Sequence, residues 1–443
     1  MTRHRYSAKP KFAAIAFLAV AALCIAFAFW LHAACGNPES PWAQYPALQR
    51  IYLLLWGEPE TSVNVNPLPA QRDPDSPLPL LRLRAPVNIL WHERQRGTAS
   101  FAEAGGYGLA ELPMDIMGRG NSTWERGKRP YQIRFEEPVE LLGMGAARKW
   151  ILLACSLDKS LLRPQLAHRL AAYICSGWTP AMRPIELEIN GVYQGVYLLA
   201  EKAEPGRNRL PLPEGAVFLR ADMRAGPAEA FELPSGLRVA PESPGWNELS
   251  PAERESIQEF LYTVENALYE DAPGAWAQYF DLDALVDWFL VEELCNNVDA
   301  AMVASVYFTL LPEGKLRFGP VWDFDLCMAN AGVQGLPAYE GWATALNGHG
   351  WFAELTQRPG FMDLVRARYA ALAADGIYEE IDAWITEMAM QLKIPQKTNY
   401  QAWPIGMDLP LEPLFVSESW EEHVAYVREY FAKRRAWLEG ELG

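Results

Sequence analysis

The feature that most constrains this chain is an apolar run that ends in two carboxylates, since residues 319–325 read GPVWDFD. Residues two apart in an extended chain point to the same face, so Asp323 and Asp325 would leave a core strand together. Carboxylate oxygens are hard ligands that suit Mg²⁺ or Mn²⁺, and a cation held there can also receive phosphate oxygens. The alternative is an ordinary turn in which each aspartate accepts backbone N–H groups. The surrounding sequence has to decide between the two.

Length and composition indicate a globular protein with a large core. The chain has 443 residues, 50% of them hydrophobic, and its 17 Trp, 18 Tyr and 18 Phe supply bulky core side chains. The formal net charge of −16 argues against a nucleic-acid polymer as a partner, because neutralising its phosphates requires a clustered basic surface. A phosphorylated small molecule is compatible with this charge if a local basic cluster faces the acidic site.

The amino terminus predicts membrane attachment. Basic residues precede an apolar run over residues 12–31, which is long enough to cross a bilayer and would keep its basic flank in the cytoplasm. Two interpretations stay open, an uncleaved signal anchor and a lipoprotein signal that ends at Cys35. His32 stands where a lipobox usually has leucine, which favours the anchor. Residues 1–35 are therefore expected to hold the folded part at a membrane, outside the cytoplasm.

Composition and periodicity divide the rest of the chain. Residues 36–85 are rich in proline and predict a spacer. Residues 86–443 are expected to fold, with residues 86–203 as a β-rich lobe and residues 204–443 as a mostly helical lobe. The clearest local signal is a β-hairpin that turns at Asn190-Gly191.

The expected elements follow the same patterns of hydrophobic spacing. Outside that hairpin, strands are expected at residues 87–91, 131–135, 149–154, 303–311 and 315–322. Helices are expected at residues 158–173, 256–269, 283–297, 361–374, 378–392 and 420–438.

Several motifs, in this order along the chain, resemble the spore coat protein H-like (CotH) family of atypical protein kinases. The resemblance spans residues 87–330 and is carried by RGNSTW at 119–124, LLGM at 141–144, DKSLLR at 158–163, NGVYQGVYLL at 190–199, NVD at 297–299 and GPVWDFD at 319–325. It implies an α+β chain with a divergent, two-lobed protein-kinase-like fold, preceded by the membrane anchor, and a nucleotide bound between the lobes.

The resemblance also implies roles for the acidic residues. Asp299, the aspartate of the Asn-x-Asp motif, would be catalytic, and Asp323 would bind the metal. Asp325 would be a second metal ligand or support the first, and Ser305 would help to hold the ion. These roles agree with phosphoryl transfer, in which the protein mainly positions groups and neutralises charge. The implied cofactors are ATP with Mg²⁺ or Mn²⁺, and the implied acceptor is a Ser or Thr of a protein substrate.

A nucleotide also needs partners for its phosphates. The sequence offers one asparagine and several basic residues without ranking them: Arg119, Lys128, Lys149, Arg163, Lys202 and Asn297. Each has a structural alternative, such as a salt bridge across a turn for Arg119 or a helix cap for Asn297. Asp158, close to Arg163, could simply cap the helix that follows it. Arg134 lies where the family more often has lysine.

Three functions are weighed. The preferred hypothesis is a membrane-tethered, ATP- and Mg²⁺-dependent protein Ser/Thr kinase, and the alternative is a catalytically inactive surface binding or adhesion module of the same family. Carbohydrate processing by paired carboxylates explains the aromatic content but not the order of the motifs. Zinc chemistry is not indicated, because the sequence has neither a Cys-x-x-Cys pair nor a histidine cluster.

Overall fold

The computed structural model describes residues 67–104, 107–226, 228–270, 274–302, 304–332, 338–346 and 350–443. The predicted anchor at residues 1–35 and most of the predicted spacer lie outside this part, so the predicted location of the protein stays a prediction. Within the described residues, no helix has both the length and the apolar character needed to span a membrane. Residues 66–443 form one compact unit.

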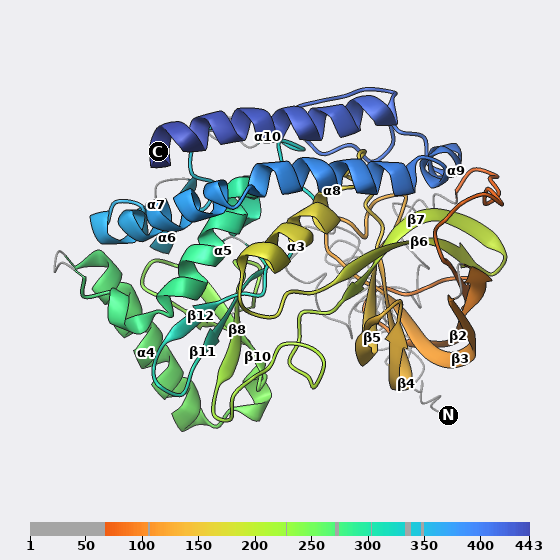
Figure 1. The fold of residues 1–443 in the computed structure, drawn as a ribbon. Helices are drawn as coiled ribbons and strands as arrows, with labels where there is room; N and C mark the ends of the chain where they lie inside the picture. Colours follow the sequence, from red (N-terminus) through yellow and green to blue (C-terminus); the bar gives the residue numbers. More distant parts are fainter. Residues whose placement is uncertain are drawn as a thin grey trace, which may run out of the picture. The chain divides into compact units, whose positions relative to one another are not determined.

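The first half of this unit is a closed β-barrel with the strand order β1-β2-β3-β4-β5-β7-β6 (Figure 1). Its strands are β1 Leu80–Arg84, β2 Gln95–Ala104, β3 Tyr107–Gly118, β4 Tyr131–Leu141, β5 Met144–Leu153, β6 Met182–Ile189 and β7 Val192–Glu201. Alternate side chains fill the interior, where Ile133, Trp150 and Tyr197 are completely buried.

The predicted hairpin is confirmed and joins β6 to β7. Asn190 and Gly191 have φ angles of 53° and 81°, the left-handed conformation that a tight two-residue hairpin turn requires.

The predicted spacer boundary at residue 85 does not match the structure. Leu80–Arg84 pairs antiparallel with β2 and parallel with β6, so this strand closes the barrel. Residues 87–91, predicted to be the first strand, contribute only an isolated bridge between Trp91 and Gly118.

The second half combines a five-stranded sheet with helices. The sheet has the order β12-β11-β8-β10-β9. Its strands are β8 Val217–Ala221, β9 Phe231–Glu232, β10 Arg238–Ser243, β11 Val306–Leu310 and β12 Leu316–Phe318. Only the last two were expected, because residues 204–250 had been assigned to a mostly helical region. The unit is therefore α+β throughout.

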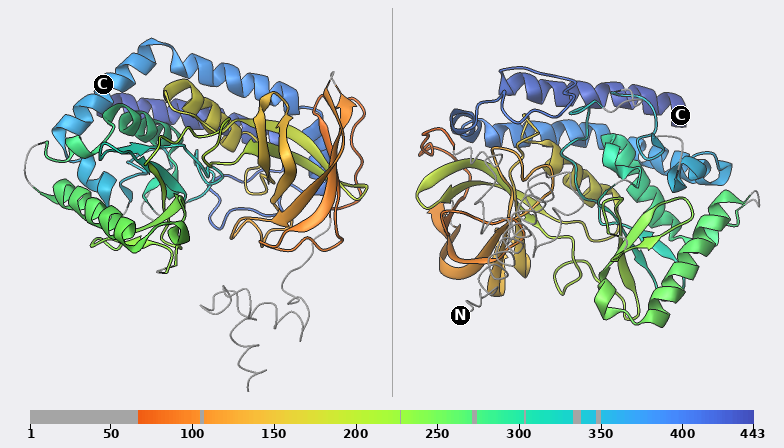
Figure 2. Two further views of the ribbon diagram at one scale, coloured as in Figure 1. Left: turned by 90° about the horizontal axis from the view of Figure 1, so that it is seen from below. Right: turned by 180° about the vertical axis from the view of Figure 1, so that it is seen from behind.

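The helices flank this sheet and extend toward the barrel (Figures 1 and 2). They are α3 Arg163–Ile174, α4 Pro251–Tyr269, α5 Leu282–Cys295, α6 Trp351–Leu355, α7 Pro359–Ala374, α8 Ile377–Leu392, α9 Pro395–Ala402 and α10 Trp420–Leu442, with short 3-10 turns η1 Trp246–Glu248, η2 Ala277–Tyr279 and η3 Val298–Ala300. Their core is aromatic, and the ring of Trp288 stacks on Phe352 with centroids 5.0 Å apart.

Helix α9 and the residues after it connect the carboxy-terminal region to the barrel. Trp403 Nε1 donates to the Gln194 carbonyl at 2.9 Å, and the Val196 N–H donates to Asn399 Oδ1 at 3.0 Å. Gly195 permits this approach, because a Cβ at this position would lie 2.5 Å from Asn399 Oδ1. The barrel wall beside the site therefore depends on residues near the end of the chain.

Candidate active site

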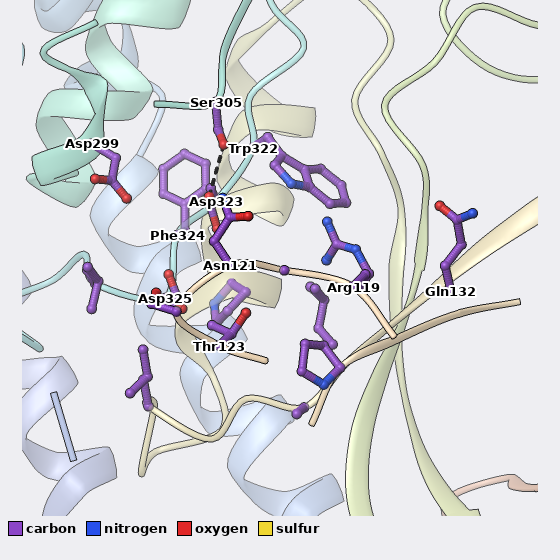
Figure 3. A pocket seen from close by; sticks show the side chains of 18 of the residues that line it. Arg119, Asn121, Thr123, Gln132, Asp299, Ser305, Trp322, Asp323, Phe324 and Asp325 are labelled. Carbon is purple, nitrogen blue, oxygen red and sulfur yellow. Dashed lines mark hydrogen bonds between the residues drawn. The ribbon is translucent and has the colours of Figure 1, made fainter. Parts of the chain in front are cut away.

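A cavity of about 420 Å³ lies between the outer wall of the barrel and the second sheet. Its volume falls in the range typical of small-molecule sites. All three predicted aspartates, Asp299, Asp323 and Asp325, line it together with Ser305 (Figure 3). Residues that are distant in sequence thus converge on one space.

Asp323 and Asp325 reach the cavity from a loop instead of a strand. Strand β12 ends at Phe318, and Asp323 has φ = 70°, a left-handed conformation that is unusual for a residue with a side chain. Ser305 is also left-handed, with φ = 58°, and its Oγ donates to Asp323 Oδ2 at 3.0 Å. The extended-chain argument was therefore wrong locally, although both carboxylates do line the cavity. Backbone strain of this kind is often concentrated at functional sites.

Asp299 is presented by the turn that follows α5. Asn296 ends the helix in a left-handed conformation, and Asn297 then caps η3 by accepting the Asp299 N–H at 3.4 Å. The Asn297 amide donates to Glu292 Oε2 at 2.9 Å. Asn297 does not line the cavity, so it orients the turn that carries Asp299. The alternative for Asn297, a carboxy-terminal cap of the preceding helix, falls on Asn296 instead, and the predicted contact of Asn297 with nucleotide lacks geometric support.

The acidic side chains affect one another's protonation. The pKa of Asp299 is raised to about 7, mainly by burial and in part by the charge of Asp323, while Arg224 opposes the shift. Burial raises the pKa of Asp325 to about 8, again with contributions from Asp323 and Asp299. Clustered carboxylates with raised pKa values are typical of sites that bind a cation or transfer a proton.

Two of the predicted cations line the cavity. The Arg119 guanidinium lies 5.8 Å from the centre of the Trp322 ring. Burial lowers the pKa of Arg119, and the charge of Asp323 partly offsets that effect. Lys202 lines the cavity too, and its Nζ donates to Glu204 at 3.2 Å. Arg119 thus combines a position beside the aspartates with a side chain that no carboxylate in the described part of the chain pairs at salt-bridge distance.

The other predicted cations are held by protein atoms outside the cavity. Lys128 is 3% exposed, and its Nζ donates to the Val196 carbonyl and to Asn399 Oδ1. Lys149 pairs with Glu204 at 2.7 Å. Neither residue lines the cavity, so their predicted contact with nucleotide lacks geometric support. Arg134 instead faces a surface groove that includes Asp115.

Arg163 belongs to a buried structural cluster. Its Nη1 lies 2.7 Å from Asp158 Oδ1, and its backbone N–H donates to Asp158 Oδ2 at 2.8 Å. Asp158 thus binds the first residue of α3, but the helix begins at Arg163 and not at the predicted residue 158, and Leu162 is its N-cap residue. Arg163 also reaches the Met328 carbonyl at 3.4 Å, in the chain segment just after Asp325. Arg163 supports the loop of the aspartates without facing the cavity.

Sequence reasoning missed several polar residues of the cavity. Arg220, Asp222 and Arg224 line it from β8 and the turn that follows, in a stretch for which the sequence predicts no element. Arg220 Nε pairs with Glu242 at 2.7 Å. Gln132 lines the cavity from the outer face of β4. Its neighbour Tyr131 lies in the motif region, but the sequence contained no signal that singled out Gln132.

The donor set limits what kind of metal site this cavity can be. Among the described residues, no group of three or more His, Cys, Asp or Glu side chains is arranged to hold a metal ion by itself. Asp323, Asp325 and Ser305 offer two carboxylates and one hydroxyl. Mg²⁺ often binds through one or two carboxylates and takes its remaining ligands from water and substrate phosphates. The cavity therefore suits a metal ion that arrives with a phosphorylated ligand better than a permanent structural ion.

Comparison with protein-family models decides the family. The model described as CotH kinase protein matches residues 116–438. The chain belongs to the CotH kinase family. This confirms the membership predicted from the motifs, and the match extends the likeness through α7, α8 and α10. None of the curated proteins compared with the chain matches it.

Membership gives the coarse functional class of this CotH protein, that of a kinase. Asp299 and Asp323 lie in motifs that carry the resemblance to the family. Arg220 and Arg224 line the same cavity but lie outside those motifs. The cavity geometry adds which of the motif residues face a common space.

Proposed function

We propose that this CotH protein is an ATP- and Mg²⁺-dependent kinase that transfers a phosphoryl group to Ser or Thr of a protein acceptor. In this proposal the barrel and the sheet-and-helix region act as the two lobes of a divergent kinase-like fold. One observation carries the proposal: Asp299, Asp323 and Asp325 line a single cavity with Arg119. Phosphoryl transfer needs this combination of a base, metal ligands and a phosphate cation.

The residues present fit a magnesium–nucleotide complex. Asp323, Asp325 and Ser305 would hold the ion, which supplies charge neutralisation for the transferring phosphoryl group. Burial, with smaller contributions from the charges of Asp323 and Asp299, raises the pKa of Asp325, and a divalent cation would offset these effects. Arg119 would face the phosphates from the barrel side.

Asp299 would act on the acceptor. Its carboxylate would accept a hydrogen bond from the acceptor hydroxyl and so orient that oxygen, and it would take up the proton as the oxygen bonds to phosphorus. A pKa of about 7 is close to the pH at which a general base works best. Asn297 and the short turn η3 would hold this carboxylate in place.

The test is transfer of labelled phosphate from ATP by the full-length chain, with and without Mg²⁺. We expect incorporation into the chain itself or into a serine-rich protein, and loss of incorporation when Mg²⁺ is chelated. Asp299→Asn should abolish transfer and retain nucleotide binding, measured as the rise in melting temperature on adding ATP with Mg²⁺. A wild type that binds nucleotide without transfer would instead support the inactive binding module.

A further inference from the structure

A row of side chains crosses the outer face of the barrel beside the cavity. Residues directly opposite one another on paired strands share a face, and the pairing runs from Met117 on β3 to Gln132 on β4, then to Ile151, Ala200 and Met182 on β5, β7 and β6. The other four members of this row are apolar. Packing alone would favour an apolar residue on β4 as well.

Gln132 is buried without a protein partner. The residue is 7% exposed, and no described residue makes a hydrogen bond to its side-chain amide. Its neighbours in the row pack densely, since Ile151, Ala200 and Met182 belong to a buried cluster that includes Trp322. Gln132 lines the cavity, so its amide, set among apolar neighbours and without a hydrogen bond to a described residue, is available to a ligand that completes it.

The order of groups along the cavity suggests which part of a ligand meets this amide. In Figure 3, Asp299 lies at one end, Asp323 and Arg119 follow, and Gln132 lies at the other end. The register agrees, because Arg119 follows β3 and its N–H donates to the Pro130 carbonyl at 3.3 Å, two residues before Gln132. This order matches acceptor, phosphates and base in a nucleoside triphosphate.

We propose that Gln132 is a specificity-determining residue that recognises the base of the nucleotide and selects a 6-aminopurine. The proposal rests on the proposed function, because it assigns one end of the same site. A primary amide has one acceptor and donors side by side, and it pairs with the 6-amino group and the adjacent ring nitrogen of adenine. Met117, Leu153 and Met182, which also line the cavity, supply apolar walls for a flat ring.

The test compares three ligands by calorimetric titration of the full-length chain in the presence of Mg²⁺. ATP carries the full base, purine riboside triphosphate lacks only the 6-amino group, and tripolyphosphate lacks base and sugar. For the wild type we expect ATP to bind about 10-fold more tightly than purine riboside triphosphate. Equal binding of these two ligands would overturn the proposal without any mutation.

The variant Gln132→Met replaces the amide with an apolar side chain of similar size. We expect it to remove the preference for ATP over purine riboside triphosphate and to leave tripolyphosphate binding unchanged. Its melting temperature should stay close to that of the wild type, because the change removes no hydrogen bond to a described residue and keeps the size of the side chain. Gln194→Met on β7 of the same barrel is the control, since Gln194 does not line the cavity and bonds to the Val192 carbonyl.

The outcomes separate this inference from the proposed function. A wild type that transfers phosphate from ATP, with Gln132→Met keeping the full preference for ATP, would refute the role of Gln132 alone. Equal losses for ATP and tripolyphosphate in Gln132→Met would also refute it, because the change would then act on the phosphate end. A wild type that binds none of the three ligands would refute both proposals.

Discussion

The protein has two clusters of acidic side chains, one buried around Asp158 and one half-buried at the cavity, and described protein atoms complete only the first. In the first, Asp158 accepts hydrogen bonds from Ser160 Oγ at 2.6 Å, from Arg163 Nη1 at 2.7 Å and from the Arg163 N–H at 2.8 Å. In the second, Asp299, Asp323 and Asp325 face a cavity, where burial raises the pKa of Asp299 and of Asp325 and the charge of Asp323 adds to both shifts. The comparison teaches that a charge satisfied by protein atoms is structural, and a charge left facing a cavity requires a ligand.

The largest expected effect is on the incomplete cluster. Asp323→Asn removes one of the two carboxylates that would hold the metal, and we expect phosphate transfer to fall by about 10³-fold or more. Labelled-phosphate incorporation with ATP and Mg²⁺ measures it. The matched control is Asp363→Asn on α7, whose side chain is 73% exposed. Transfer at wild-type rate in Asp323→Asn would remove the distinction between the two clusters.

The completed cluster should respond in stability instead. Arg163→Met leaves the carboxylate of Asp158 buried without its cation, and breaking one side of such a pair typically costs about 3–5 kcal/mol of unfolding free energy. Urea denaturation of the full-length chain measures this cost. The double variant with Asp158→Leu removes both charges and should recover part of it. If Arg163→Met instead weakened ATP binding at unchanged stability, Arg163 would belong with the ligand-binding residues.

Asp299→Asn is expected to abolish phosphate transfer and yet to make the folded chain more stable at high pH. Burial raises its pKa to about 7 from the ordinary value of 3.8, so between these pH values the folded chain binds more protons than the unfolded chain. Stability attributable to this group therefore falls as the pH rises through that window. We expect Asp299→Asn to unfold at higher urea concentration than the wild type at pH 8, and at the same concentration near pH 4. A variant less stable than the wild type at pH 8 would contradict this.

The smallest expected effect on nucleotide binding is that of Lys128. Because its ammonium is held by Val196 and Asn399, Lys128→Met should change ATP affinity by no more than about twofold. Burial lowers the pKa of Lys128 to about 7 from 10.5, so the unfolded chain binds more protons between these values and stability rises with pH there. Lys128→Met should flatten this rise. A loss of ATP affinity of 10-fold or more would place Lys128 among the phosphate contacts.

Local signals predicted the parts of the fold that depend on local sequence. The turn at Asn190-Gly191 and helices such as Leu282–Cys295 and Trp420–Leu442 were found because turn chemistry and apolar spacing act over a few residues. Strand β1 was missed because it is short and lies among the prolines of the predicted spacer, and its role in closing the barrel depends on pairing with β6, more than 100 residues away.

The site residues likewise fall into those that local motifs reveal and those whose role depends on contacts with distant parts of the chain. The three aspartates were found because they sit in motifs that a resemblance could identify. Which cations remain available was not predictable, because Asn399 binds Lys128 from 271 residues away. Gln132 was equally hidden, since its significance comes from strand register and from the absence of a partner among the described residues. The availability of Lys128 and the position of Gln132 are both set by contacts between residues that are distant in sequence.

The strap formed by α9 and the residues up to Asp408 has a consequence for how the molecule is made. Lys159 on the cavity-side loop donates to the Met407 carbonyl, and the N–H groups of Gly127 and Lys128 each donate to Asp408 at 3.1 Å. The ribosome must therefore synthesise the chain beyond Asp408 before the barrel wall can acquire these bonds. Nascent chains that have not yet reached this strap would lack them, so this part of the barrel is completed long after its strands are made.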